Sequence, residues 1–151
     1  MLSQKTCRRL YWFSDDLRIE TLRSFESQPQ ANNSMCVYVV DQRWFKTLQF
    51  NTSSMGKHRW QFLQDSLSHL SRALHSINQR LTVRYGDTVN QLQELIVCND
   101  ITEVVLSRPF GWYERQQLEA LKSSCKHCKF VEVDNGTLFT CLLYTSDAAD
   151  D

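Results

Sequence analysis

The segment between residues 107 and 115 carries the most distinctive chemistry of this sequence. It reads Ser-Arg-Pro-Phe-Gly-Trp-Tyr-Glu-Arg, so three aromatic side chains come directly before the carboxylate of Glu114. These aromatics are Phe110, Trp112 and Tyr113. Aromatic rings can stack on a flat heteroaromatic guest while a carboxylate accepts hydrogen bonds from its amino groups. A purely structural role explains the same residues, because aromatics pack in cores and Glu favours a helix N-terminus. The residues alone leave both interpretations open.

A pair of cysteines, Cys125 and Cys128, has the spacing found in zinc and redox sites. A closed zinc site needs four ligands, usually from a second such pair, and the sequence has none. A redox pair is expected at the start of a helix, whereas this pair follows a predicted one. We therefore interpret both residues as incidental thiols.

Other common catalytic and nucleotide-binding devices are absent from the sequence. The four glycines, at 56, 86, 111 and 136, are isolated, so there is no glycine-rich phosphate loop. No Ser or Cys lies in a nucleophile-elbow context. We interpret the four histidines, at 58, 69, 75 and 127, as surface or helix-end residues.

The composition is that of an ordinary globular domain of 151 residues, with 42% hydrophobic and 23% charged residues. Seventeen basic residues balance seventeen acidic ones, which argues against a dedicated polyanion binder. No apolar run approaches the roughly 20 residues of a membrane span. The first residues do not resemble a signal peptide, and the six cysteines are scattered. Reduced thiols and a cytoplasmic location are the expectation.

Strand and helix signals alternate along the chain. Apolar runs predict five strands, at residues 10–13, 35–40, 81–85, 103–107 and 130–133. The second run is apolar on both faces, as in a central strand of a parallel sheet. Amphipathic spacing predicts helices from Asp15 to about 25, over 57–78, from a Thr88 cap to about 96, and over 113–124. Residues 42–56 are expected to be an irregular connection.

This alternation predicts an α/β fold with a five-stranded, doubly wound parallel sheet. The arrangement is a three-layer sandwich of the Rossmann-like or flavodoxin-like kind. Ligands of such sheets bind beyond the carboxyl ends of the strands, which is where the segment around Glu114 is expected. Residues 141–151 continue no element and look like a translated adaptor sequence. We expect residues 1–140 to form the domain and residues 141–151 to be a non-native tail.

Four segments, in order, resemble the N-terminal domain of the photolyase/cryptochrome family. Residues 12–18, Trp-Phe-Ser-Asp-Asp-Leu-Arg, look like the family's opening motif after the first strand. Residues 37–43 resemble its second strand with an Asp-x-Arg exit, and residues 57–70 resemble its long helix. Residues 81–87 and the Tyr-Glu-Arg of 113–115 complete the set. Ser14 stands where the family usually has Arg.

The resemblance implies a flavoprotein whose full-length form repairs pyrimidine dimers in DNA with light, as a deoxyribodipyrimidine photolyase (a lyase). In the family this α/β domain carries an antenna chromophore, commonly methenyltetrahydrofolate or a deazaflavin. The resemblance implies that Glu114 contacts the chromophore and that Tyr113 and Phe110 lie beside it. The helical domain that binds FAD and DNA is absent from these residues. This chain alone is therefore not expected to be catalytic, and its partner in cis would be that FAD domain.

Two alternatives remain from the sequence. One is a stand-alone flavodoxin-like binding or interaction module without photochemistry. The other is a light-signalling cryptochrome, which nothing in these residues separates from a repair enzyme.

Overall fold

The computed structural model describes residues 8–19, 33–46 and 54–134. It contains a five-stranded parallel sheet in the order β3-β2-β1-β4-β5. The strands are β1 (Arg8–Phe13), β2 (Asn33–Asp41), β3 (Leu81–Gly86), β4 (Glu103–Ser107) and β5 (Lys129–Val133). The predicted fold class is confirmed, and the strand order is that of the Rossmann type, in which β1 lies between β2 and β4.

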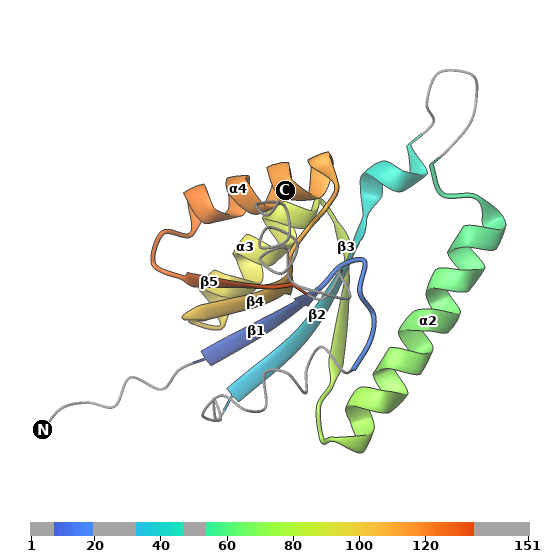
Figure 1. Cartoon of the computed structure of the whole chain (residues 1–151), viewed down its shortest axis with the longest axis horizontal. Coiled ribbons are helices and arrows are strands. Elements are labelled where there is room, and N and C mark those ends of the chain that lie inside the picture. The colour runs from blue at the N-terminus through green and yellow to red at the C-terminus, as the bar shows by residue number, and fades with distance from the viewer. Residues whose placement is uncertain (1–7, 20–32, 47–53, 135–151) are drawn as a thin grey trace, which may run out of the picture.

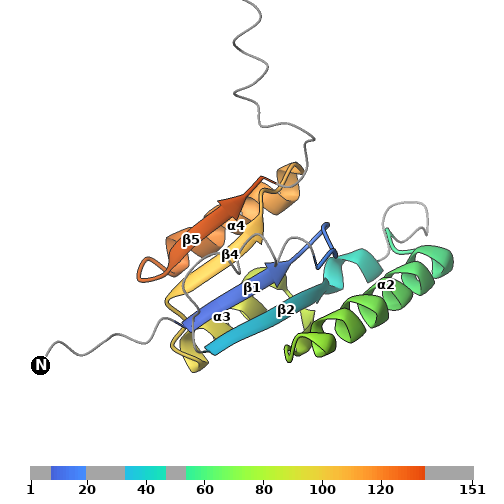
Figure 2. The ribbon, with the colours of Figure 1, turned by 60° about the horizontal axis from the view of Figure 1, so that its bottom comes forward.

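Helices cover both faces of the sheet, as Figure 1 shows. Helix α2 (Lys57–Ser76) lies on one face, and α3 (Thr88–Cys98) and α4 (Trp112–Ser124) lie on the other. A short 3-10 helix, η1 (Gln42–Phe45), follows β2. Figure 2 shows the strands running side by side, with their carboxyl ends at one edge of the sheet. The described part of the chain contains no helix long and apolar enough to cross a bilayer.

The two cores follow the apolar patterns of the sequence. Strand β2 is buried from Cys36 to Asp41, so its side chains contribute to both faces. Leu67, Leu70 and Leu74 of α2 are buried against one face, as the predicted stripe requires. Leu92 and Leu121, from α3 and α4, are buried against the other. These packing surfaces set the position of the carboxyl ends of the strands, which are the usual ligand site of open α/β sheets.

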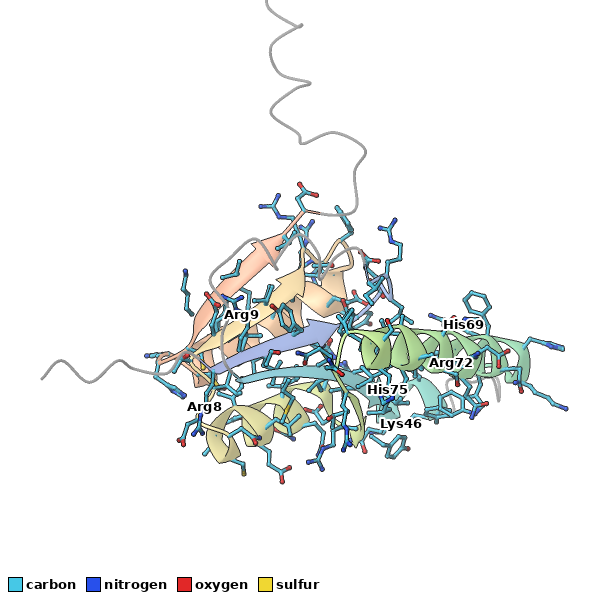
Figure 3. The ribbon with its side chains drawn as sticks, turned by 90° about the horizontal axis from the view of Figure 1, so that it is seen from below. Arg8, Arg9, Lys46, His69, Arg72 and His75 are labelled. Atoms are coloured by element: carbon cyan, nitrogen blue, oxygen red, sulfur yellow. The ribbon has the colours of Figure 1, made fainter. Side chains whose placement is uncertain are left out.

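A buried ion pair joins β1 to β4 near the amino ends of these strands. Arg9 of β1 donates to the carboxylate of Glu103 of β4, and both side chains are over nine-tenths buried. Lys129 of β5 approaches the same carboxylate at 3.5 Å. Figure 3 labels Arg9 on β1. This pairing fixes the register of β1 against β4.

Two predictions about helix starts are wrong, for local reasons. Residues 14–19 form no helix, because Asp16 accepts hydrogen bonds from the backbone and side chain of Arg18 and closes a loop. The cap of α3 is Asp87, which accepts from the backbone N–H of Asn90 at 3.0 Å. Thr88 is the first helical residue instead. The rest of the predicted first helix and the tail at 141–151 lie outside the described residues.

Candidate ligand-binding site

A cavity of about 270 Å³ lies at the carboxyl ends of β1, β2 and β4. This is the point where the strand order reverses between β1 and β4, the usual ligand site of such sheets. Most of its wall is aromatic or apolar, and polar groups converge on it from the strand ends and from α4. The aromatic lining residues are Trp12, Phe13, Tyr38, Trp44 and Tyr113.

Asp41, the last residue of β2, is the best-connected polar group of the cavity. Its carboxylate is 1% exposed and accepts hydrogen bonds from the Arg43 guanidinium at 2.7 Å and from the Arg43 backbone at 2.9 Å. It also accepts from the Thr88 hydroxyl of α3 and the Gln117 amide of α4, both at 2.9 Å. A single carboxylate therefore ties β2, η1, α3 and α4 together beneath the cavity.

The protonation of Asp41 follows from these partners. Burial alone would raise the pKa of the carboxyl, but the hydrogen bonds from Arg43 and Thr88 outweigh burial and hold the pKa below its ordinary value. Asp41 is therefore charged at neutral pH, and Arg43 balances its charge.

Glu114 reaches the cavity from the first turn of α4. Its carboxylate fills the space over Gly111, the residue that caps the helix: a Cβ at Gly111 would lie 1.8 Å from the Glu114 Oε2 atom. Gly111 has an ordinary backbone conformation, with φ −70°, so its missing side chain serves the placement of Glu114. A carboxylate here is also favourable to the helix N-terminus, in agreement with the structural interpretation made from the sequence, and the ligand-binding interpretation stays a prediction.

Asp15 and Tyr38 line the same cavity as Glu114. Asp15 follows β1, and burial together with the nearby Glu114 carboxylate raises its pKa, while Arg59 partly opposes this. Tyr38 is 4% exposed, and burial, with the nearby Asp15, raises its pKa to about 12. The Tyr38 hydroxyl is therefore neutral and able to donate a hydrogen bond.

The structure brings together two of the three site residues that the family resemblance implies. Tyr113 and Glu114 both line the cavity. Phe110 lies on an adjoining cavity of about 820 Å³, which is more open and is also lined by Phe62 and His69. Asp15 borders both cavities. The assignment of these residues to a chromophore stays a prediction.

Sequence reasoning missed Asp41, Tyr38 and Gln117 as site residues. Two signals could have found them. Asp41 ends the most apolar strand, and the end of a central strand lies at the ligand edge of the sheet. Gln117 lies three residues after Glu114, so both side chains are on the same face of α4.

The cysteine pair lies away from the cavity, in the turn between α4 and β5. The Cys128 thiol donates to the carbonyl of Ile101 at 2.9 Å, and burial, with Cys125 nearby, raises its pKa to about 11. Cys125 is 1% exposed. Protonated, buried thiols are poor nucleophiles and poor metal ligands. Within the described ranges, no group of three His, Cys, Asp or Glu side chains could hold a metal ion.

The histidines lie on the surface, as the sequence predicts. His58, His69 and His75 are exposed along α2, and His127 is exposed in the turn before β5. Figure 3 labels His69 and His75 on α2, together with Arg72. None of these histidines lines the cavity at the strand ends.

The fold and the cavity define a Rossmann-type α/β domain with a cavity at its switch point. A sequence model described as DNA photolyase matches residues 9–148. The chain therefore belongs to the DNA photolyase family, and the resemblance read from its motifs is confirmed. It corresponds to the N-terminal α/β domain of cryptochromes and photolyases.

Known relatives agree with this assignment. A cryptochrome DASH from Idiomarina loihiensis is 34% identical over 132 residues, which cover 87% of this chain and 29% of the relative. Cryptochrome-2 of Gallus gallus is 30% identical over 109 residues, covering 70% of this chain and 18% of the relative. The chain thus spans less than a third of the length of these relatives.

Solved structures share the fold. A Synechocystis cryptochrome superposes with a TM-score of 0.76 at 23% identity, covering 87% of this chain and 28% of that structure. A class III photolyase from Agrobacterium tumefaciens gives 0.72 at 22% identity, covering 91% and 28%. An archaeal photolyase from Sulfolobus tokodaii, described with two FAD molecules, gives 0.70 at 17% identity, covering 92% and 33%.

Proposed function

We propose that the cavity at the carboxyl ends of β1, β2 and β4 binds an antenna chromophore, either methenyltetrahydrofolate or a deazaflavin. In a protein that joins this domain to an FAD-binding helical domain, the chromophore absorbs light and passes the excitation to FAD. The excited FAD then drives repair of pyrimidine dimers in DNA. The α/β domain alone binds the chromophore and does not catalyse.

The observation that carries this proposal is the cavity itself. Five aromatic side chains line it, and Glu114 enters it from α4. Its volume of about 270 Å³ is close to the lower end of small-molecule pockets, roughly 300 Å³. Such a lining suits a fused heteroaromatic ring, because aromatic side chains can pack against the ring and a few placed polar groups fix its orientation. The Sulfolobus photolyase, described as implying a novel light-harvesting cofactor, supports a chromophore in this family beyond the FAD of the helical domain.

A second candidate for the whole protein is light signalling rather than repair. The observation that favours it is that both relatives described above carry the name cryptochrome. Both candidates use the same cavity in the same way, so the chromophore test applies to each.

The test is a titration of the 151-residue chain with methenyltetrahydrofolate and, separately, with a deazaflavin, followed by chromophore absorbance and fluorescence. Binding of one of them is expected. Glu114→Ala should weaken folate binding by about ten- to a hundred-fold, since a charge-assisted hydrogen bond contributes about 1.5–3 kcal/mol. Glu94→Ala, which removes an exposed carboxylate on α3, is the matched control. Failure to bind either compound, or equal affinity in both variants, contradicts the proposal.

A further inference from the structure

The polar groups of the cavity divide into two sets by their hydrogen bonds. Asp41, Arg43, Thr88 and Gln117 bond to one another. They form the floor of the site and are largely satisfied without a ligand. Asp15, Glu114 and Tyr38 line the same cavity, and none of these three side chains has a hydrogen bond with any residue in the described part of the chain.

Tyr38 adds a hydroxyl group to the second set. The residue is 4% exposed. A buried hydroxyl without a hydrogen bond is costly, at about 1–3 kcal/mol. No described side-chain N or O atom is both fully enclosed and unpartnered. The Tyr38 oxygen therefore opens onto the cavity, where only a bound molecule or water can satisfy it.

The charges of the cavity favour ligands that donate hydrogen bonds. Three carboxylates, Asp15, Asp41 and Glu114, line it with a single guanidinium, that of Arg43, which Asp41 already engages. Arg59 on α2 lies close enough to oppose the charge of Asp15 in part, but it does not line the cavity. Ionised carboxylates only accept hydrogen bonds. Asp15 and Glu114 therefore offer a ligand hydrogen-bond acceptors and no donors.

We infer that Asp15 is a specificity-determining residue of this site. Together with Glu114 and Tyr38, it selects a ring that presents an amino group beside a ring N–H, and rejects a ring of the same shape that presents carbonyl oxygens there. The inference rests on the proposed chromophore site and deepens it. It assigns a role to Asp15, which the site residues implied by the sequence did not include.

The physical reason is the cost of unmatched polar groups. An amino group beside a ring N–H can donate two parallel hydrogen bonds to one carboxylate, the strongest arrangement available to a neutral ring. A carbonyl at the same position turns its lone pairs toward the carboxylate and leaves both groups without a hydrogen-bond donor. Sites that are built to hydrogen-bond a donor reject analogues without the donor strongly, often by orders of magnitude.

The experiment compares two probes that differ at one position. Pterin carries a 2-amino group, and lumazine carries a carbonyl in its place on the same pteridine ring. Affinities of both for the 151-residue chain are measured by fluorescence titration at pH 7, for the wild type, Asp15→Asn, Glu114→Gln and Glu94→Gln. Circular dichroism confirms that each variant is folded. We expect pterin to bind at least about tenfold tighter than lumazine, and Asp15→Asn to lower this ratio at least about fivefold. Glu94→Gln should leave the ratio unchanged.

Each result decides a different point. Equal binding of the two probes by the wild type overturns the selectivity while leaving the chromophore site intact. A ratio that Asp15→Asn leaves unchanged overturns the role of Asp15, even if Glu114→Gln lowers it. Binding of neither probe, and of neither chromophore, overturns the proposed function and this inference together. Because the readout is a ratio, a general loss of stability in a variant cannot imitate the expected result.

Discussion

Replacing Asp41 by Asn tests whether one carboxylate holds the floor of the cavity together. The substitution keeps the size of the side chain and one acceptor oxygen. It removes the charge and turns an N–H₂ group toward donors from Arg43, Thr88 and Gln117. Removing one partner of a fully buried ion pair costs about 3–5 kcal/mol. The Arg43 side chain is 44% exposed, so it regains water and the cost falls. We expect Asp41→Asn to lower the free energy of unfolding by about 2–4 kcal/mol.

Urea unfolding followed by circular dichroism measures this loss, with the midpoint compared at constant slope. For a domain of this size the loss corresponds to a fall in Tm of about 5–15 °C. Asp100→Asn is the control, since Asp100 is 85% exposed and pairs with Arg8 at the surface at 3.3 Å. Surface pairs contribute about 0–1 kcal/mol. Equal shifts in the two variants would refute the argument that Asp41 organises the site.

The same variant has a distinctive dependence on pH. The pKa of Asp41 is depressed in the folded state, so its contribution to stability is fully present above the ordinary carboxyl pKa. The contribution is lost as pH falls through the depressed value. The gap in stability between wild type and Asp41→Asn should therefore narrow on acidification. Asp15 behaves in the opposite sense. Its pKa is raised in the folded state, so its charged form lowers the stability of the native state at neutral pH.

Three further perturbations test the core, the placement of Glu114 and the buried thiol. Leu74→Ala should lower the free energy of unfolding by about 2–5 kcal/mol, measured by urea unfolding, because Leu74 is fully buried between α2 and the sheet. Gly111→Ala should weaken pterin binding as much as Glu114→Gln does, with unchanged circular dichroism, since a methyl group at 111 occupies the space of the Glu114 carboxylate. Normal pterin affinity in Gly111→Ala would show that this placement is unimportant. Iodoacetamide at pH 7 should alkylate exposed Cys98 well before Cys128, whose pKa is raised to about 11, and peptide mass spectrometry resolves the two.

The layers of the fold were predictable because apolar spacing is a local property of the chain. The run around Val37 is apolar at consecutive positions, which requires burial on both faces and hence a central strand. The apolar residues of α2 form a stripe along one side of the helix, so only that side is expected to be buried. The loop after β1 was not predictable in this way. Acidic residues favour a helix start, but they also close loops on neighbouring backbone groups, as Asp16 does.

The site was predictable only where one segment carries several of its residues. Tyr113 and Glu114 are adjacent in sequence, and the aromatic segment that contains them drew attention to them. The network beneath them joins Asp41 to Gln117 across 76 positions and to Thr88 across 47. Such pairings depend on the depth and register at which α3 and α4 pack on the sheet. Either Asp87 or Thr88 could cap α3 by local rules, and only the distant Asp41 decides that the Thr88 hydroxyl turns inward.

The position of β1 between β2 and β4 also sets the order in which the domain can fold. Arg9 and its partner Glu103 are 94 residues apart. At about 5–20 residues per second, the ribosome needs roughly 5–20 s to add that length. During this time the central strand of the future sheet has one unpaired edge, and unpaired strand edges promote aggregation. Long-range parallel pairing of this kind is also slow to form. We therefore expect a nascent chain to reach its native sheet only after β4 has been synthesised.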